Sequence, residues 1–323
     1  MLDTRYMWLA LAVLAVIVAA YDWTRRSATG PAGEPVAYVT AVEDGKPVTR
    51  SLGRAECVAT AERVWAATEQ GVECIAYLVP EGGVPGGKAV LYFEGDVADQ
   101  SAENAQRMIA GYRRIAGQFK ERFGLPLIVI GRPGLMGSSG FHLLGGRRDE
   151  GEILNEAVEA LKRKLGLRQI VLAGQSGGAR VAAQLLVLGR SDVACAAMGS
   201  GAYGVPASGR GKLRTNVFGE PGQRYLVPLR QVERVVPARE RRLFVIGDPR
   251  DQRTPFEEQR QWAEALGAQG HHAVLHSANG SGPEHHGLSL VALQVAGMCA
   301  AGKSDAEIAA YVARQRSEAA RGP

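Results

Sequence analysis

Short apolar runs alternate with helical stretches through most of this 323-residue chain, and this alternation limits its fold more than any other feature. The runs that we predict as buried strands are Val72–Val79, Lys88–Phe93, Leu127–Ile130, Gln169–Ala173, Val193–Met198, Leu243–Ile246 and His272–His276. The stretches with helical periodicity are Ser101–Phe123, Gly151–Leu165, Gly177–Leu188, Pro255–Leu266 and Gly287–Ala300. Strands joined through long helices imply crossover connections, so the pattern predicts an α/β fold with a mostly parallel, doubly covered central sheet.

The first predicted strand also has an antiparallel partner. Val64–Thr68 and Val72–Val79 are separated only by Glu69-Gln70-Gly71, which predicts an N-terminal hairpin leading into the parallel region. No internal repeat or low-complexity tract interrupts the alternation, so residues 36–323 are predicted to form one domain. Residues 25–35, which contain the stretch SATGPAGEP, are predicted to be a linker.

Residues 1–24 are predicted to be a signal peptide or a membrane anchor. Met7–Ala20, MWLALAVLAVIVAA, is an unbroken apolar run of 14 residues, a length typical of the core of a signal peptide. Aromatic residues at both ends of the run resemble interfacial anchors, and the 18 residues from Tyr6 to Trp23 would span roughly 27 Å as a helix at about 1.5 Å per residue. Both alternatives predict export, either to the periplasm or to an inner-membrane anchor, and an uncleaved segment would contact the membrane.

The stretch IVLAGQSGGARVAAQLL, residues 170–186, joins a predicted buried strand to a predicted helix through a glycine-rich turn. Its centre has the G-x-S-x-G spacing of a nucleophile elbow, in which a serine occupies a strained strand-to-helix turn. Gly174 and Gly178 allow the strand and the helix to approach closely, and Gln175 and Gly177 flank the serine. Ser176 is therefore the candidate nucleophile.

A serine hydroxyl needs a base, and the base needs an orienting acid. In a strand-and-helix architecture with such an elbow, both are expected downstream, in the order serine, acid, histidine, each just after a later strand. The strand predicted at 243–246 is followed by GDPRDQRTP, which supplies Asp248 and Asp251. The strand predicted at 272–276 is followed by SANGSGPEHHG, which supplies His285 and His286. The order along the chain and the position after a strand do not decide between Asp248 and Asp251 as the acid, or between His285 and His286 as the base.

With these motifs the chain resembles the α/β-hydrolase family over residues 63–300, through the stretches AGQSGG, FVIGDPRDQRTP, EHHG and YFEGD. In the family pattern Gly-x-x-Asp-x-x-x-Pro, Pro255 places the acid at Asp251, and Gly247 precedes Asp251 with one residue more than the pattern has. The resemblance therefore favours Asp251 as the acid. The family histidine is usually followed by Gly or an apolar residue, which favours His286. The resemblance implies a Ser176–His286–Asp251 triad that needs no cofactor.

The resemblance also implies an oxyanion hole made by the backbone N–H groups of Asp96 and Gly177. The family usually has His-Gly at this turn, whereas this chain has Glu94-Gly95. Backbone donors tolerate that change, but it places the carboxylates of Glu94 and Asp96 near a developing negative charge. The stretch GRPGLMGSSG, residues 131–140, resembles the loop that borders the active site, and we interpret it as shaping the site without taking part in the chemistry.

Two phosphate-binding motifs fail on their context. Gly82–Ala89, GGVPGGKA, lacks the hydroxyl that would hold magnesium and precedes a strand, whereas a P-loop follows one. Gly199–Gly204, GSGAYG, matches G-x-G-x-x-G, but Pro206 and the glycines after it oppose the helix that should receive the pyrophosphate. We therefore predict no nucleotide cofactor, and a net charge of +5 over 323 residues does not predict nucleic-acid binding.

The histidines and cysteines do not predict a metal site. Five of the six histidines fall within His271–His286, but His272 and His276 on one strand would lie about 13 Å apart at roughly 3.3 Å per residue. The four cysteines have no Cys-x-x-Cys spacing. Two alternatives remain for Cys57 and Cys74: they pair in an oxidising compartment, or Cys74 is a core thiol.

The segment 200–242, between two predicted strands, is where the family often inserts a cap, and we predict a small one here. It has three acidic residues and nine basic ones, Arg210, Lys212, Arg214, Arg224, Arg230, Arg234, Arg239, Arg241 and Arg242. This charge indicates either a solvated face or attraction of an acidic substrate or an anionic membrane surface.

These features together predict an exported serine hydrolase. It would cleave the ester or peptide-like acyl bond of a small-molecule or peptide-like substrate through an acyl-enzyme. The alternative is a catalytically idle hydrolase fold that serves as a binding or scaffold protein of the cell envelope, and the Glu94 substitution is its best support.

Overall fold

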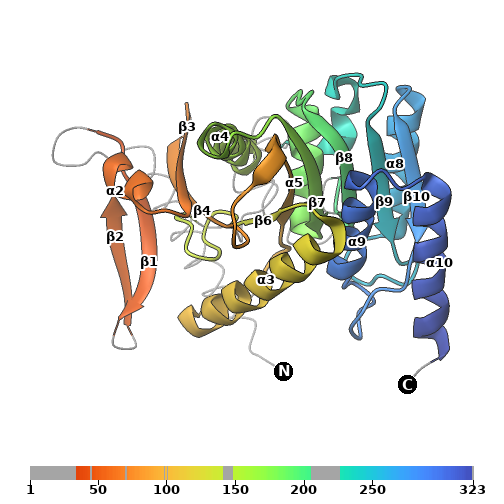
Figure 1. Ribbon diagram of the computed structural model, residues 1–323, viewed down its shortest axis with the longest axis horizontal. Coiled ribbons are helices and arrows are strands. Elements are labelled where there is room, and N and C mark those ends of the chain that lie inside the picture. Colours follow the sequence, from red (N-terminus) through yellow and green to blue (C-terminus); the bar gives the residue numbers. More distant parts are fainter. Residues whose placement is uncertain are drawn as a thin grey trace, which may run out of the picture.

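An eight-stranded sheet forms the centre of the computed structural model (Figure 1). The structure describes residues 34–43, 46–69, 71–97, 99, 101–140, 148–204 and 226–321. The predicted signal peptide or anchor, most of the linker, and residues 205–225 of the predicted cap lie outside these ranges. Within them, no helix combines the length and the apolar character that a membrane span needs.

The strand order across the sheet is β10-β9-β8-β7-β5-β6-β4-β3. The bounds are β3 Arg63–Thr68, β4 Gly71–Leu78, β5 Lys88–Phe93, β6 Leu127–Ile130, β7 Gln169–Gln175, β8 Val193–Gly199, β9 Arg242–Gly247 and β10 His272–Ser277. Strands β5 to β10 pair in parallel, while β4 pairs antiparallel with both β3 and β6. The predicted mostly parallel sheet with an N-terminal hairpin is therefore confirmed, and the carboxyl ends of the parallel strands share one edge.

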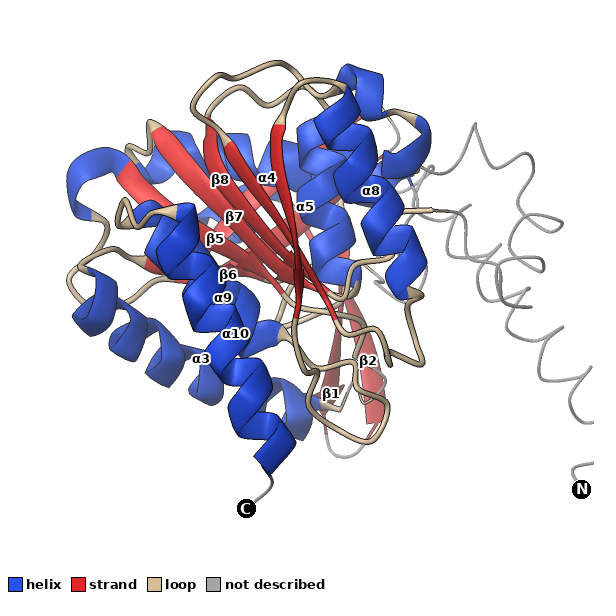
Figure 2. Ribbon diagram, turned by 90° about the vertical axis from the view of Figure 1, so that its right-hand side faces the viewer, coloured by secondary structure: helices blue, strands red, loops and turns tan. Residues whose placement is uncertain are grey.

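Helices cover both faces of this sheet (Figure 2). One face carries α4 (Arg148–Leu165), α5 (Gly177–Val187) and α8 (Phe256–Ala268). The other carries α3 (Ala102–Phe123), α9 (Ser289–Ala300) and α10 (Asp305–Arg321). The predicted double cover is confirmed, although α10 is an addition to the predicted helices. Ser304 and Glu307 cap it reciprocally, because Ser304 N donates to the Glu307 carboxylate and Glu307 N donates to Ser304 Oγ.

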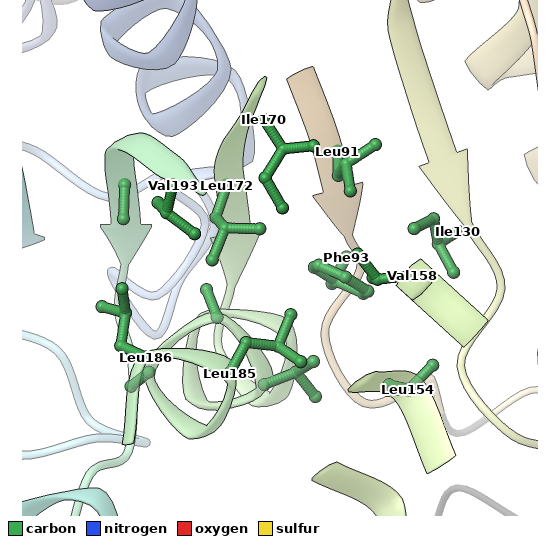
Figure 3. Close-up of a cluster of buried hydrophobic side chains, with 14 of the residues drawn as sticks. Leu91, Phe93, Ile130, Leu154, Val158, Ile170, Leu172, Leu185, Leu186 and Val193 are labelled. Carbon is green, nitrogen blue, oxygen red and sulfur yellow. The ribbon is translucent and has the colours of Figure 1, made fainter. Parts of the chain in front are cut away.

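Alternate residues of the central strands fill two apolar cores, one on each face of the sheet. Figure 3 shows the core beneath α4 and α5, with the labelled side chains Leu91, Phe93, Ile130, Leu154, Val158, Ile170, Leu172, Leu185, Leu186 and Val193. The intervening residues of β5 and β7 belong to the core on the opposite face, namely Val90, Tyr92, Val171 and Ala173. Burial on both faces explains why these strands are almost continuously apolar in sequence.

A second, two-stranded sheet and a short helix precede the main sheet. Strands β1 (Ala37–Glu43) and β2 (Lys46–Leu52) pair antiparallel, and α2 (Arg54–Ala59) follows them. This hairpin lies beside β3 and β4 at one end of the molecule (Figure 1). It is another addition to the predicted elements.

Two disulfides pair all four cysteines of the chain. Cys57–Cys74 joins α2 to β4 across 17 residues of sequence, which is the first of the two alternatives left open above. Cys195–Cys299 joins β8 to α9 across 104 residues and has no signal in the sequence.

The described part of the predicted cap, from Leu226 onward, forms two short 3₁₀ turns before β9. These are η3 (Pro228–Arg230) and η4 (Val232–Arg234). The extent of a cap between them and β8 falls on residues 205–225, outside the described ranges.

Candidate active site

Ser176 occupies the turn between β7 and α5, at the carboxyl edge of the sheet. Its backbone has φ 54° and ψ −118°, a combination that residues with a Cβ atom strongly disfavour. The surroundings hold it there, because Ser176 N donates to Gly199 O at 2.8 Å and Ser176 O accepts from Arg180 N at 3.1 Å. The residue is partly exposed, so a strained backbone presents this serine at the end of a buried strand.

Glycines allow this turn to pack against the neighbouring strand. A Cβ atom at Gly178 would collide with the Phe93 carbonyl at the end of β5, and one at Gly174 would collide with the Gly178 backbone. Such contacts leave no room for any side chain. The close approach expected at Gly174 and Gly178 is therefore present in the structure.

His286 and Asp251 are brought together from two different loops. His286 Nδ1 lies 3.0 Å from Asp251 Oδ1 and 2.9 Å from Asp251 Oδ2. The Asp251 side chain is fully buried, and the His286 side chain is 11% exposed. A buried carboxylate against one ring nitrogen favours the tautomer that carries its proton on Nδ1, which leaves Nε2 with a free lone pair.

Asp251 is held as a carboxylate by the turn after β9. Oδ1 accepts from Arg253 N at 2.8 Å and from Thr254 N at 3.0 Å, and Oδ2 accepts from Thr254 Oγ1 at 2.8 Å. Burial alone would raise the pKa of Asp251, but the hydrogen bonds from His286, Thr254 and Arg253 lower it below its usual value. The negative charge facing His286 is thus stable at neutral pH.

The other candidate acid, Asp248, has different partners. Its carboxylate accepts from Arg250 N at 2.9 Å, from the Arg250 guanidinium at 3.0 and 3.1 Å, and from Gly280 N at 2.8 Å. Burial alone would raise the pKa of Asp248, but the bonds from Arg250 and Gly280 lower it. The nearest histidine contact is His285 Nδ1, at 3.8 Å. Asp248 therefore ties the loop after β9 to the loop after β10.

Gln175 connects the serine turn directly to the histidine loop. Its side-chain Nε2 donates to His286 O at 2.9 Å, and its Oε1 accepts from Leu288 N at 2.9 Å. The Gln175 side chain is buried. One carboxamide next to Ser176 thus grips the backbone on both sides of Gly287 and sets the position of His286 relative to the serine.

The turn after β5 packs onto the serine from the other side. A Cβ atom at Gly95 would lie 3.1 Å from Ser176 Cβ and 3.2 Å from Gln175 O. One at Gly177 would collide with Asp96 Oδ1. Gly177 is also the first residue of α5, where backbone N–H groups have no partner within the helix. Asp96 and Gly177 therefore lie together beside Ser176, as the oxyanion-hole hypothesis requires.

Glu94 has a local structural role that the sequence did not reveal. Its Oε1 accepts from Gly95 N at 2.7 Å, and its Oε2 accepts from Tyr92 Oη at 3.3 Å. Burial raises the pKa of Glu94, and the hydrogen bonds from Gly95 and Tyr92 only partly offset that effect. The carboxyl group thus braces its own turn.

Arg132, in the loop after β6, is the residue of this site that sequence reasoning missed. Its Nη1 contacts Asp96 Oδ1 at 2.8 Å and Glu94 O at 3.2 Å, and its Nε contacts Glu150 Oε1 at 2.8 Å. Burial alone would lower the pKa of Arg132, but Glu150 and Asp96 raise it, so the guanidinium stays charged. Arg132 fixes the turn that carries Asp96 and balances its carboxylate. The stretch GRPGLMGSSG therefore contributes a charge as well as a shape.

The histidines of β10 lie away from these residues in other contacts. His272 Nε2 pairs with Asp305 at 2.6 Å, and the His276 ring stacks on Phe244 with centroids 5.9 Å apart. In the described ranges, no group of three or more His, Cys, Asp or Glu side chains is placed to hold a metal ion.

The strand order, the double helical cover and this arrangement of loops define the α/β-hydrolase fold. Prolyl oligopeptidase B from Galerina marginata shares it with a TM-score of 0.51 and 13% identity, over 75% of this chain and 36% of that chain. The match to an esterase from Pyrococcus furiosus has a TM-score of 0.47 and 18% identity, over 77% and 93% of the two chains. No family model and no curated protein matches the sequence.

Proposed function

We propose that the protein is a serine hydrolase that cleaves an ester or peptide-like acyl bond through an acyl-enzyme. The observation that carries this proposal is the Gln175 side chain, which joins the strained turn of Ser176 to the loop of His286. A glycine-rich turn with an idle serine has no need for such a link. The hydrogen bond between Asp251 and His286 supplies the third member of the triad.

The proposed mechanism follows from the charge of Asp251 and from the ring nitrogen of His286 that carries the proton. The ionised Asp251 holds the His286 proton on Nδ1, so Nε2 accepts the proton of Ser176 Oγ as this oxygen attacks the carbonyl carbon. His286 then gives that proton to the leaving group, and the acyl chain remains on Ser176. A water molecule, deprotonated by His286 in the same way, releases the acid and restores the serine.

The backbone N–H groups of Asp96 and Gly177 are the proposed donors to the oxyanion. Backbone donors in a fixed turn need no rearrangement when the charge develops, which is the main source of such stabilisation. The carboxylate of Asp96 would oppose that charge, but Arg132 pairs with it at 2.8 Å. Glu94 directs its carboxyl group to Gly95 N and Tyr92 Oη. This local role gives Glu94 a structural explanation that does not require an idle scaffold protein.

Export is part of the same proposal. The apolar run at 7–20 supports a signal peptide or an anchor, and pairing of all four cysteines is typical of proteins in oxidising compartments. Residues 1–30 fused to a reporter that is active only outside the cytoplasm should give activity. A fusion that works only inside the cell would contradict export.

Fluorophosphonate labelling combined with hydrolysis of a p-nitrophenyl ester tests the chemistry. Wild-type protein should be labelled and active, whereas Ser176→Ala should lose both properties and keep its melting temperature, because the hydroxyl does not pack in the core. Ser200→Ala is a matched control, since Ser200 also has a positive φ, of 47°, but lies after β8. Wild-type turnover by Ser176→Ala would refute the proposal.

A further inference from the structure

Arg180 differs from the other buried arginines in the described part of the chain. Those three all have partners: Arg132 binds Asp96 and Glu150, Arg190 binds Asp192 and Glu159, and Arg241 donates to three backbone carbonyls. Arg180 is only 9% exposed. Within the described residues, its Nε and Nη2 atoms are enclosed without a hydrogen-bond partner, and no ion pair involves Arg180.

An unpaired buried guanidinium is unfavourable, because it gives up hydration without gaining a counter-charge. Natural folds retain such groups at functional sites, where a ligand supplies what the protein lacks. An arginine that served only to stabilise α5 would be expected to have an acid or a carbonyl within reach, as its three buried counterparts do. Arg180 therefore indicates a missing anionic partner.

Arg180 also lies one helical turn from the candidate nucleophile. Ser176 is the N-cap of α5, and Arg180 N donates to Ser176 O at 3.1 Å. Residues four apart lie on the same side of a helix, and long helical side chains lean toward the N-terminus. By this rule we expect the guanidinium of Arg180 to lean toward the end of α5 that carries Ser176. Gln184, one turn further on, contacts Leu226 and Gly151, so this side of α5 faces α4 and the segment that precedes β9.

We infer that Arg180 binds an oxyanion, a carboxylate or a phosphate, carried by the acyl portion of the substrate. This inference rests on the proposed function and specifies its substrate class as short acyl groups with a negative charge near the scissile carbonyl. Arginine suits the task because its planar fork donates two parallel hydrogen bonds to either anion. The positive end of the α5 dipole, at the same end of the helix, adds to the attraction.

A matched pair of substrates tests the preference: p-nitrophenyl butyrate and p-nitrophenyl hemisuccinate, which differ mainly by a terminal carboxylate. Wild type should prefer the hemisuccinate in kcat/KM. Arg180→Met should lower kcat/KM for the hemisuccinate by about ten- to a hundredfold, the size of a lost charge-assisted hydrogen bond, and leave butyrate hydrolysis near the wild-type rate. Arg163→Met, which removes an exposed arginine near the far end of α4, should leave the preference unchanged. Equal loss with both esters would overturn the inference.

Thermal denaturation provides a second measurement that needs no catalysis. Without ligand, Arg180→Met should melt at or above the wild-type temperature, because it removes an unpaired charge. Succinate and inorganic phosphate, added separately at constant ionic strength, should raise the melting temperature of wild type and not that of Arg180→Met, and their relative effects distinguish a carboxylate site from a phosphate site. A shift that persists in Arg180→Met, or strong destabilisation of the ligand-free variant, would overturn the anion site. If wild type hydrolyses neither ester, the proposed hydrolase fails, while an Arg180-dependent shift would still support the anion site.

Discussion

Replacing Gln175 by Met tests whether one side chain sets the position of the histidine loop. Methionine has nearly the same size and keeps the core filled, but it forms no hydrogen bond to His286 O or Leu288 N. Both bonds measure 2.9 Å and are buried. A buried backbone group that loses its partner costs about 1–3 kcal/mol, so the two together predict a loss of about 2–6 kcal/mol in the free energy of unfolding.

The effect on catalysis should exceed what stability alone explains. Without its anchor the His286 loop can shift, and a misplacement of about 1 Å lowers a rate by roughly a hundredfold. We expect kcat to fall by about ten- to a hundredfold with KM nearly unchanged, because Gln175 acts on the base and not on the substrate. Urea denaturation measures the first effect, and steady-state hydrolysis of a p-nitrophenyl ester measures the second.

Gln184→Met is the matched control for this experiment. Gln184 lies in α5, the helix that follows Gln175 and Ser176; it is fully buried and donates to Leu226 O at 2.9 Å. Its loss should therefore cost about 1–3 kcal/mol with an unchanged kcat. If Gln175→Met is destabilised but turns over like wild type, Gln175 is only a structural residue. If neither its stability nor its turnover changes, the reasoning from the two hydrogen bonds is wrong.

The remaining predictions concern the paired acids and histidines. Asp251→Asn should lower kcat for a p-nitrophenyl ester by about 10³–10⁴-fold, because it favours the wrong tautomer of His286. Asp248→Asn should lower kcat only slightly in the same assay. A larger loss of kcat in Asp248→Asn than in Asp251→Asn would show that Asp248 is the acid. His286→Ala should match Ser176→Ala, and the double variant should be no worse than either, whereas a severe His285→Ala would contradict the assignment of the base. Since the folded pKa of Asp248 lies below its unfolded value of about 3.9, its contribution to stability is present above that pH and is lost as the pH falls through the folded pKa. Urea denaturation between pH 2 and pH 5 should therefore show that the free energy of unfolding of Asp248→Asn falls less steeply with decreasing pH than that of wild type. The same pH dependence in both proteins would contradict this reasoning.

The central strands could be predicted from sequence because their burial on both faces leaves a continuous apolar run. Strands β5 and β6 occur at the predicted bounds, Lys88–Phe93 and Leu127–Ile130. Helix α10 escaped prediction, although Ser304 and Glu307 form a capping box and Ile308 and Val312 follow with helical spacing. That signal was present in the sequence.

The parts of the site that could not be predicted depend on contacts between distant loops. Arg132 becomes important only because its loop approaches the turn of Asp96, 36 residues earlier. Arg180 reads in sequence as an ordinary polar residue of a helix, and only the burial of its guanidinium without a partner distinguishes it. The sequence spacing favours Asp251 over Asp248 as the acid of the triad. The physical reason appears only in the structure, where the turn directs the Asp248 carboxylate toward Gly280 N.

The two disulfides together imply an order of assembly. Four cysteines allow three pairings, yet the native ones differ in span, 17 residues for Cys57–Cys74 and 104 for Cys195–Cys299. As the chain emerges from its N-terminus, the short loop closes while Cys299 is still absent. Only one pair of thiols then remains, and no wrong partner is left for Cys195. Emergence from the N-terminus onward can therefore select the correct disulfide pairing by itself. If Cys57 and Cys74 were oxidised only after Cys299 had emerged, all four thiols would be present together and wrong pairs could form.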